Sequence, residues 1–387
     1  MRPFSFLSIL ALTATHSLAI PTRYITPAER GLLDAPGVLD NVVLFDAPAF
    51  PDPQNPENTL AFFQAYVSLR TPDLGVATTA ITSLLSSLGI NVGNDLNTLQ
   101  QRIKLLASVG LPGKKVEVVV PGCELSGKLP ATSVSDLGLA GAAVSLGSCV
   151  QNAIEMEASV LPGAMDSRKF TASVFPSKNS GFGVISGGST LTDVDDTVKV
   201  SNVLDKVALL KSTFLEAPKA VSGMPELYTS LSKSLQGPQF VYVTGSAYQF
   251  YPFLNEFIDS TYASAKGPIF SQNLTVLNIP QAVEFLTSNQ GTLDFKVATI
   301  DRLQTMYPQK KWLAIGDSTQ KDPEAYATAF KKRDTISCIW IRRVEGADNS
   351  DARFNTAFAD VPAGKFRTFN DTEIPKLADI DVAGGQC

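Results

Sequence analysis

Three continuous apolar runs in the second half of the chain constrain its fold most strongly. They are residues 240–243, 312–315 and 336–341, and polar residues follow each of them directly. A run without polar alternation is typical of a parallel strand that is buried on both faces. Stretches with helical spacing, such as 323–330, separate the runs. The pattern predicts an α/β region with a doubly wound, mostly parallel sheet and a ligand site at the carboxyl ends of its strands.

The first half of the chain has a different pattern. Strand-length segments such as 59–70 and 116–120 are separated by residues that favour turns, whereas 76–108 has apolar residues at three- and four-residue steps. We therefore expect a β-rich, sandwich-like N-terminal domain with a helical insertion. The expected parts are a signal peptide at 1–19, this β-rich domain at 20–178, the α/β domain at 179–350 and a C-terminal tail at 351–387.

The N-terminus has the pattern of a secretory signal. Arg2 precedes the apolar run 4–12, and Ser17 and Ala19 are the small residues that a signal peptidase recognises. The run is too short to span a membrane, so we expect cleavage near Ala19 and a secreted, extracellular protein. The single histidine, His16, would leave with the signal. Histidine-dependent nucleophilic catalysis and histidine-ligated zinc are thereby excluded.

An even number of cysteines in a secreted chain permits two disulfides. The cysteines are Cys123, Cys149, Cys338 and Cys387. Pairing of Cys123 with Cys149 is favoured because both lie in the N-terminal region, whereas Cys338 lies in an apolar strand pattern and could equally be a buried thiol. Glycosylation sequons begin at Asn273 and Asn370, which agrees with secretion of a glycoprotein.

Acidic residues cluster before the first helix of the α/β region. The motif is Asp193-Val194-Asp195-Asp196-Thr197. Two carboxylates one residue apart converge only where a strand ends and a loop curls. Close like charges are costly unless a cation lies between them or one carries a proton. The motif therefore indicates Mg²⁺, an acid–base carboxyl or both, with an acidic surface turn as the plain alternative.

Other polar residues stand at the ends of the expected strands and helices. They are Thr244 with Gly245, then Lys296 at the start of a predicted helix, then Asp317 with Asp322 five residues further on. Each residue alone is a weak signal. Because the carboxyl ends of parallel strands share one edge of a sheet, their order predicts that they converge on one site.

With these motifs the chain resembles the haloacid dehalogenase-like (HAD-like) phosphohydrolases, and among them the fungal actin-patch-associated phosphatidate phosphatases. The resemblance covers about residues 181–345. The segments that carry it are 193–199, 223–228, 242–254, 315–326 and 338–344. It implies a HAD-like fold without a large cap and a Mg²⁺-dependent phosphoric monoester hydrolase.

The resemblance also implies a role for each candidate residue. Asp193 would attack phosphorus to give an aspartyl-phosphate, and Asp195 would act as general acid and then general base. Phosphate would be bound by Thr244, Gly245 and Lys296. Mg²⁺ would be held by Asp193, the backbone carbonyl of Asp195, Asp317 and Asp322. Oxygen ligands without imidazole suit this ion.

One segment departs from the family pattern. In the family, the counterpart of 183–186 runs directly into the acidic motif, whereas here 187–192 stands between them. A Gly-Gly pair is poor in a strand interior. Either 190–192 re-form the strand end and 187–189 bulge out, or the nucleophile is displaced, or a splice site in the gene is misassigned.

The expected substrate is a phosphate monoester, with phosphatidate hydrolysed to diacylglycerol as the leading candidate. Two alternatives stay open: a non-catalytic secreted binding protein on the same scaffold, and a phosphatase for a soluble phosphate monoester. The net charge of −5, without a basic stripe, excludes nucleic acid as a partner. Peripheral membrane contact is compatible with a lipid substrate, although the net charge gives no bulk attraction to an anionic surface. Protein partners are not indicated.

Overall fold

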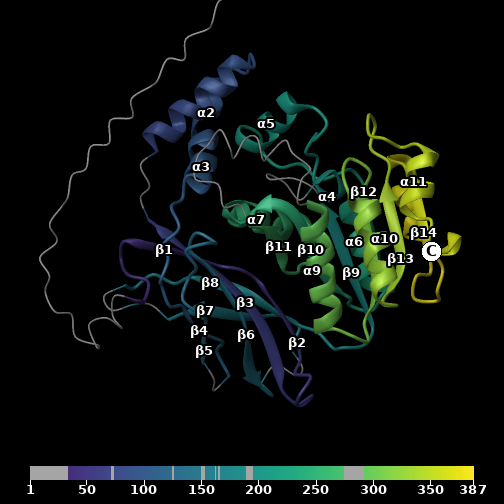
Figure 1. The fold of residues 1–387 in the computed structure, drawn as a ribbon, viewed down its shortest axis with the longest axis horizontal. Coiled ribbons are helices and arrows are strands. Elements are labelled where there is room, and N and C mark those ends of the chain that lie inside the picture. The colour runs from purple at the N-terminus through teal and green to yellow at the C-terminus, as the bar shows by residue number, and fades with distance from the viewer. Residues whose placement is uncertain are drawn as a thin grey trace, which may run out of the picture.

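Two β-sheets of different construction form a mixed α/β protein (Figure 1). The structure, a computed structural model, describes residues 34–70, 74–123, 126–149, 153–161, 163, 166–188, 195–273 and 292–387. For Val76, Asn94 and Asp195 it describes the backbone alone. Within these ranges the first sheet has eight strands and the second has six.

The first sheet belongs to the N-terminal half and is mostly antiparallel, with the order β1-β3-β2-β8-β7-β4-β5 and β6 paired to β3. Its strands are β1 (Asp40–Leu44), β2 (Ala47–Pro51), β3 (Thr59–Leu69), β4 (Glu117–Val119), β5 (Ser126–Lys128), β6 (Leu139–Gly147), β7 (Met156–Val160) and β8 (Thr171–Pro176). They form one connected sheet instead of two separate ones. Its ends meet where Val144 of β6 packs over Gly127 of β5, so close that a Cβ on the glycine would lie 2.2 Å from Val144 Cγ1.

The predicted helical insertion between β3 and β4 is confirmed. It consists of α2 (Gly75–Ser87) and α3 (Leu96–Leu106), joined through a 3₁₀ turn, η1 (Gly93–Asp95). Ile81 of α2 and Ile103 of α3 are fully buried and pack in one cluster with Phe214 and Phe250 of the C-terminal half. The regularly spaced apolar residues of α2 and α3 therefore pack against residues of the C-terminal half.

The second sheet is parallel throughout, as the unbroken apolar runs predicted. Its order is β11-β10-β9-β12-β13-β14. The strands are β9 (Phe182–Gly188), β10 (Gln239–Ala247), β11 (Ile269–Gln272), β12 (Lys311–Asp317), β13 (Ile336–Arg342) and β14 (Phe366–Phe369). All nine residues of β10 are buried, which is why its sequence shows no polar alternation.

Helices cover both faces of the parallel sheet. Val184 and Leu313 point into a core that includes α6 and α7, whereas Ile185 and Trp312 point into a core that includes α9 and α10. In Figure 1, α9 and α10 run in front of the strands. The helices are α4 (Asp195–Val198), α5 (Lys206–Phe214), α6 (Met224–Ser234), α7 (Tyr251–Thr261), α9 (Thr292–Met306), α10 (Asp322–Lys332), α11 (Asp351–Ala357) and α12 (Ile374–Leu377). Among the described residues, no helix has the length and apolar character needed to cross a membrane.

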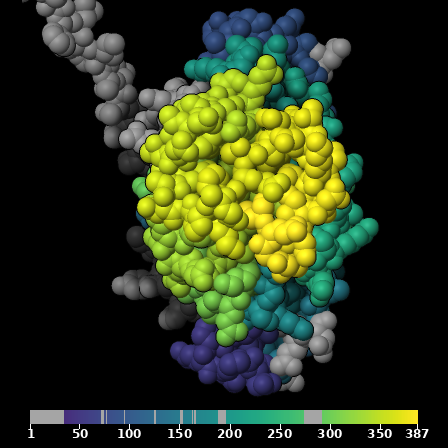
Figure 2. All heavy atoms as spheres, turned by 90° about the vertical axis from the view of Figure 1, so that its right-hand side faces the viewer, coloured from purple at the N-terminus to yellow at the C-terminus, as the bar shows by residue number. Residues whose placement is uncertain are grey.

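The segment set apart above as a C-terminal tail packs against the parallel sheet. It supplies β14, and Ile374 and Leu377 are buried in the core that holds α6 and α7. Figure 2 shows these C-terminal residues covering one face of the molecule. Cys387 is joined to Cys338 in β13 by a disulfide, so Cys338 is paired and is not a free buried thiol.

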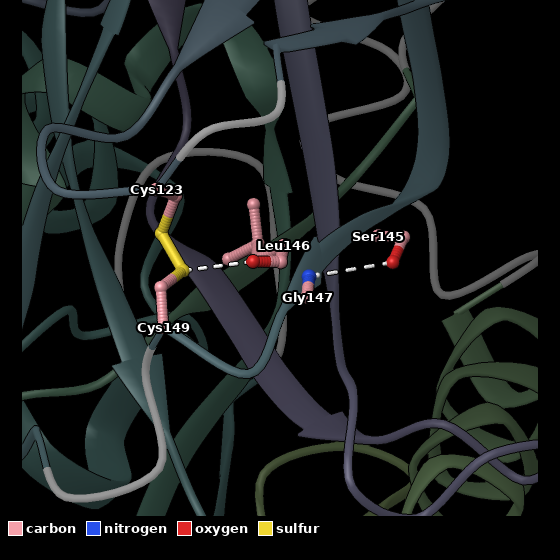
Figure 3. The surroundings of a disulfide bond; sticks show 5 residues. All are labelled: Cys123, Ser145, Leu146, Gly147 and Cys149. Atoms are coloured by element: carbon pink, nitrogen blue, oxygen red, sulfur yellow. Dashed lines mark hydrogen bonds between the residues drawn. A yellow bond between two sulfur atoms is a disulfide. The ribbon is translucent and has the colours of Figure 1, made fainter.

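The expected disulfide between Cys123 and Cys149 is present (Figure 3). It links the turn after β4 to the turn after β6, across a sequence separation of 26 residues. All four cysteines are therefore paired, and the described part of the chain contains no free thiol.

Aromatic side chains join the two sheets. Phe45 packs on Tyr251 of α7 with ring centroids 4.4 Å apart, and the Tyr307 hydroxyl donates to the carbonyl of Ala49 at 3.0 Å. Between them, the backbone N–H of Asp46 donates to the Tyr251 hydroxyl at 2.7 Å. Burial raises the pKa of the Asp46 carboxyl to about 6.

Candidate functional site

The candidate site lies at the carboxyl edge of the parallel sheet, between β9 and β12, where the order of the strands reverses. From β9 the chain continues to β10 on one side, whereas from β12 it continues to β13 on the other. Ligands of open α/β sheets bind at such a switch point. Thr244 is in register with Gly188 of β9, and Ile315 is in register with Ser186. Because strands lie about 4.8 Å apart, Thr244 and Asp317 emerge on either side of β9, about 10 Å from each other.

The acidic motif enters this edge from β9. Asp193 lies outside the described residues, and Asp195 begins the short helix α4 with its side chain undescribed. Their roles as nucleophile and acid–base residue stay predictions. Thr197, two residues further on, is fully buried and donates from Oγ1 to Asp317 Oδ2 at 2.9 Å. This bond ties the acidic motif to the end of β12.

Asp196 anchors the chain immediately after the two candidate catalytic acids. Its carboxylate accepts backbone N–H bonds from Ser201 at 2.8 Å, Asn202 at 3.0 Å and Val203 at 3.2 Å. Burial raises the pKa of Asp196, the charge of Asp317 adds to this, and the three N–H donors oppose it. The residue therefore fixes the loop and is not placed to receive a solvent-exposed substrate.

A guanidinium at the end of β13 holds the same loop from the other side. Arg342 Nη1 donates to the backbone carbonyl of Asp196, while Nε and Nη2 bind Asp371 at 2.6 and 2.8 Å. Arg342 itself is almost completely buried. No role for Asp196 or Arg342 was predicted from the sequence, in which the only signal for Arg342 is its position at the end of an apolar run.

Asp317 is the acceptor at the centre of the site. Its Oδ2 receives the Thr197 hydroxyl, and its Oδ1 receives the N–H of Thr319 at 2.8 Å and the hydroxyl of the same residue. The carboxylate is fully buried. Three donors thus bind the two oxygens of this side chain, which holds it in one orientation.

Lys296 and Asp322 form a buried ion pair next to Asp317. The Lys296 ammonium contacts Asp322 Oδ1, and the two side chains are 0% and 1% exposed. Asp322 Oδ2 also accepts the backbone N–H of Asp317 at 3.1 Å. Burial raises the pKa of Asp322, and the charge of Asp317 raises it further, whereas the Lys296 ammonium lowers it. The predicted convergence of these three residues is therefore present.

Thr244 and Gly245 lie at the end of β10, on the opposite side of β9. Thr244 is fully buried, donates from Oγ1 to Ser246 Oγ at 2.9 Å, and accepts the backbone N–H of Ser246 at 3.0 Å. Gly245 is buried as well. The hydroxyls of Thr244 and Ser246 thus bind each other at the end of β10 and form a small polar cluster at the sheet edge.

The Gly-Gly segment that departs from the family pattern belongs to the strand. Gly187 and Gly188 continue β9 in register with Val243 and Thr244, so they do not bulge out. A Cβ on Gly187 would lie 1.9 Å from Tyr326 Oη and 3.0 Å from Asp322 Oδ2. Glycine therefore lets α10 bring Asp322 against the strand. The expected re-formed strand at 190–192 lies outside the described residues.

Three buried carboxylates, those of Asp196, Asp317 and Asp322, lie at this edge. Lys296 is paired with Asp322, and the Arg342 guanidinium contacts the Asp196 carbonyl and Asp371. Close buried carboxylates need a cation or a proton. Oxygen donors without imidazole or thiolate suit Mg²⁺. Within the described part of the chain, no three acidic, His or Cys residues are grouped to hold a metal.

Comparison with known proteins finds a family that matches the segment carrying the site. Residues 188–343 match the family described as phosphatidate phosphatase APP1, catalytic domain. The resemblance to the fungal phosphatidate phosphatases inferred from the motifs is confirmed. The matched segment begins at the last residue of β9 and ends after β13, so it contains every candidate residue of the site.

One curated relative of this family is the phosphatidate phosphatase APP1 of Saccharomyces cerevisiae. It is 28% identical over 160 residues, which is 40% of this chain and 26% of the yeast protein. The chain thus spans about a quarter of that relative's length. Among solved structures, a ferredoxin-NADP⁺ reductase from Plasmodium falciparum covers 86% of this chain and 95% of its own, at 10% identity and a TM-score of 0.19. A score at that level says nothing about the fold.

Proposed function

We propose that this protein is a phosphatidate phosphatase that releases phosphate from the lipid and leaves diacylglycerol. The family match over 188–343 supports the activity. The observation that carries the proposal is the meeting of Thr197, Asp317, Asp322 and Lys296 at the switch point of the parallel sheet, next to the acidic motif. The strand order and the two helical layers support a HAD-like, doubly wound catalytic domain.

In the proposed reaction the residues of the acidic motif carry the chemistry. Asp193 attacks phosphorus and forms an aspartyl-phosphate, while Asp195 protonates the leaving alkoxide. Asp195 then removes a proton from the water that hydrolyses the intermediate. Thr197 and Arg342 hold the two ends of this loop through Asp317 and the Asp196 carbonyl, which limits the motion of the reacting carboxylates.

The phosphoryl group is bound by residues on both sides of β9. Thr244 and Gly245 offer a hydroxyl and a backbone N–H at the end of β10, and Lys296 offers a buried ammonium. Because the Lys296 side chain is fully buried, its charge acts at low dielectric on the negative charge that develops at phosphorus. Asp322 keeps this ammonium in place while the site is empty of phosphate.

The three buried carboxylates at this edge support Mg²⁺ as the cofactor. Asp193, the backbone carbonyl of Asp195, Asp317 and Asp322 would hold it. When bound, this ion offsets the repulsion between the carboxylate nucleophile and the phosphate anion. Thr319 and Thr197 orient Asp317 through its two oxygens, as residues that support a metal ligand do.

We also propose that the protein is secreted and glycosylated. The two disulfides agree with an oxidising compartment, in which such bonds persist. Asn370 is exposed at the start of a 3₁₀ turn, η4 (Asp371–Glu373), and is open to modification. Asn273 instead donates to Asp136 Oδ1 at 2.5 Å, so Asn370 is the better glycosylation site.

Phosphate release by the purified protein tests the function. The substrates are phosphatidate in mixed micelles and a soluble aryl phosphate, each with Mg²⁺ and with EDTA. Mg²⁺-dependent release that Asp193→Asn abolishes is the expected result, and a higher kcat/KM for phosphatidate supports the lipid assignment. Release that is equal in Asp193→Asn overturns the mechanism. Release from the aryl phosphate alone assigns a soluble substrate, and no release from either substrate assigns a non-catalytic scaffold.

A further inference from the structure

Large apolar side chains that are exposed to solvent gather at one end of the first sheet. Among the described residues, nine such side chains are exposed, and six of them lie in the loops at this end. They are Val38, Leu39, Leu69, Val109, Val134 and Leu161, and we call them the apolar tip. Leu39 and Val134 are each 75% exposed. Scattered apolar residues need no explanation, but a cluster marks a contact surface.

The register of the sheet shows that these residues share one end. Asp40 at the start of β1 pairs with Leu69 at the end of β3, and Tyr66 pairs with Leu139 at the start of β6. Val118 of β4 pairs with Val160 at the end of β7. Strands β1, β4 and β6 therefore begin where β3 and β7 end, and the loops before or after them emerge together.

Backbone hydrogen bonds fasten the loops of the tip to one another. Arg70 N–H donates to the Leu39 carbonyl and Leu69 N–H to the Val109 carbonyl, both at 2.9 Å. Gly138 N–H donates to the carbonyl of Ser133, next to Val134, at 3.0 Å. The apolar side chains are thus presented by an ordered backbone and form a lasting surface.

The charged residues of these loops favour an anionic partner. Asp40 and Asp166 are buried and are paired with Lys114 and Arg168. The remaining cations, Arg70, Lys115 and Lys169, are exposed; of the remaining acids, Asp34 pairs with Lys115 at 2.7 Å and half-buried Asp136 accepts a hydrogen bond from Asn273. The tip therefore carries apolar groups with a small positive excess, in a chain whose net charge is −5. Apolar side chains flanked by Lys and Arg are the composition of a surface that enters the interface of an anionic bilayer.

The tip is joined to the catalytic edge of the second sheet. The Tyr248 hydroxyl, just after β10, lies 3.4 Å from the carbonyls of Asp136 and Leu137 in the loop that holds Val134. Asn273, just after β11, binds Asp136. The loop that carries part of the tip thus rests on the carboxyl ends of β10 and β11, the edge at which Thr244 lies.

We propose that the apolar tip docks the protein on an anionic lipid surface that contains its substrate. This inference rests on the proposed function, because it names the surface from which phosphatidate reaches the site. The apolar side chains enter the interface, and Arg70 and Lys169 contact lipid phosphates. Docking then holds the enzyme on the surface while the site works.

Vesicle binding tests the docking surface directly. The full-length protein is sedimented with phosphatidylcholine vesicles that contain phosphatidate and with vesicles of phosphatidylcholine alone. The variant Leu39→Ser/Val134→Ser removes the two most exposed side chains of the tip. Ile154→Ser is the matched control, because Ile154 is 90% exposed but precedes β7 and lies at the other end of the sheet. Arg70→Gln/Lys169→Gln tests the cations separately.

The expected result is a loss of vesicle affinity of about tenfold or more in the double serine variant and none in Ile154→Ser. The Arg70→Gln/Lys169→Gln variant should lose the preference for phosphatidate-containing vesicles. kcat/KM for the soluble aryl phosphate should be unchanged in all variants. Equal vesicle binding by the double serine variant, or no binding by the wild type, overturns the inference. If the wild type dimerises without binding vesicles, and the double serine variant does not dimerise, the tip is a protein-contact surface.

These outcomes separate this inference from the proposed function. If the protein hydrolyses phosphatidate in micelles but binds vesicles independently of the tip, only the docking surface is wrong. If the tip mediates vesicle binding and no substrate is hydrolysed, only the catalytic proposal is wrong.

Discussion

The buried pair of Lys296 and Asp322 makes a quantitative prediction. Lys296→Met leaves the Asp322 carboxylate without its cation in a place where both side chains are at most 1% exposed. Removing one partner of a buried ion pair costs about 3–5 kcal/mol, because the remaining charge has lost both water and partner. We expect Lys296→Met to lower the free energy of unfolding by that amount. Urea unfolding at pH 7 in EDTA, followed by far-UV circular dichroism, measures it without a contribution from metal.

A double variant of Lys296 and Asp322 distinguishes the loss of the ion pair from a loss of packing contacts. Asp322→Asn removes the negative charge and keeps an oxygen that can accept the Asp317 N–H. The variant Lys296→Met/Asp322→Asn should therefore be more stable than Lys296→Met alone, with a coupling energy above about 1 kcal/mol. Lys128→Met is the matched control, because its partner Glu117 is 3.9 Å away and the lysine is 79% exposed. That control should leave stability unchanged.

The pH dependence of the single variant has a definite sign. Burial and Asp317 already raise the pKa of Asp322, and loss of the Lys296 ammonium raises it further. A carboxyl whose pKa is higher in the folded state binds its proton more readily when folded. The destabilisation of Lys296→Met relative to wild type should therefore shrink as the pH falls from 7 to 5. The buried ion pair would be refuted if Lys296→Met lowered the free energy of unfolding by less than about 1 kcal/mol, independently of pH and additively with Asp322→Asn.

Three other changes have predictable effects on stability. Gly187→Ala places a Cβ 1.9 Å from Tyr326 Oη and should cost about 1–3 kcal/mol in thermal unfolding, while Gly364→Ala, with no atom within 4 Å, should not. Burial raises the pKa of Asp46 from 3.8 to about 6, so ionisation of this carboxyl becomes increasingly destabilising as the pH rises between those values and carries its full cost above pH 6. Asp46→Asn should therefore gain up to about 3 kcal/mol at pH 7 and almost nothing at pH 4 in urea titrations. Cys387→Ser opens a disulfide with a separation of 49 residues and should cost about 4 kcal/mol in urea, and an unchanged midpoint would contradict this.

The periodic parts of the sequence were sufficient to predict the elements they form. Unbroken apolar runs became β10, β12 and β13 because each strand is covered by helices on both faces. The three- and four-residue steps of 76–108 became α2 and α3. In each case burial of a regular pattern determines the local structure, and that pattern is visible without a model of the surroundings.

Pairings between distant segments could not be predicted in the same way. The disulfide from Cys338 to Cys387 depends on the return of the C-terminal residues to β13, which no local pattern encodes. Arg342 could not be assigned to the site because its partners, the Asp196 carbonyl and Asp371, are 146 and 29 residues away. Asp317 and Asp322 could be assigned to the site from the sequence because they follow an apolar run, and parallel strands end at a common edge.

The Gly-Gly segment shows how a local rule can mislead at a site. Glycine weakens a strand through its backbone entropy, so Gly187 and Gly188 suggested a bulge. The structure keeps both in β9, in register with β10. Tyr326 and Asp322 occupy the space that a side chain at 187 would need. The close approach of α10 to the strand accounts for a residue that propensity alone disfavours.

The buried charged residues support the proposed catalytic site over the alternative of a non-catalytic binding protein. Asp196, Asp317 and Asp322 are buried near Lys296 and Arg342, and the pKa values of Asp196 and Asp322 are raised by burial and by Asp317. Apolar residues of the same size would pack at this edge at lower energetic cost. Binding a partner through the first sheet, as the non-catalytic alternative requires, gains nothing from these buried acids. A divalent cation and a phosphate anion would interact favourably with these carboxylates and with Lys296, and this complementarity supports the proposed phosphatase activity.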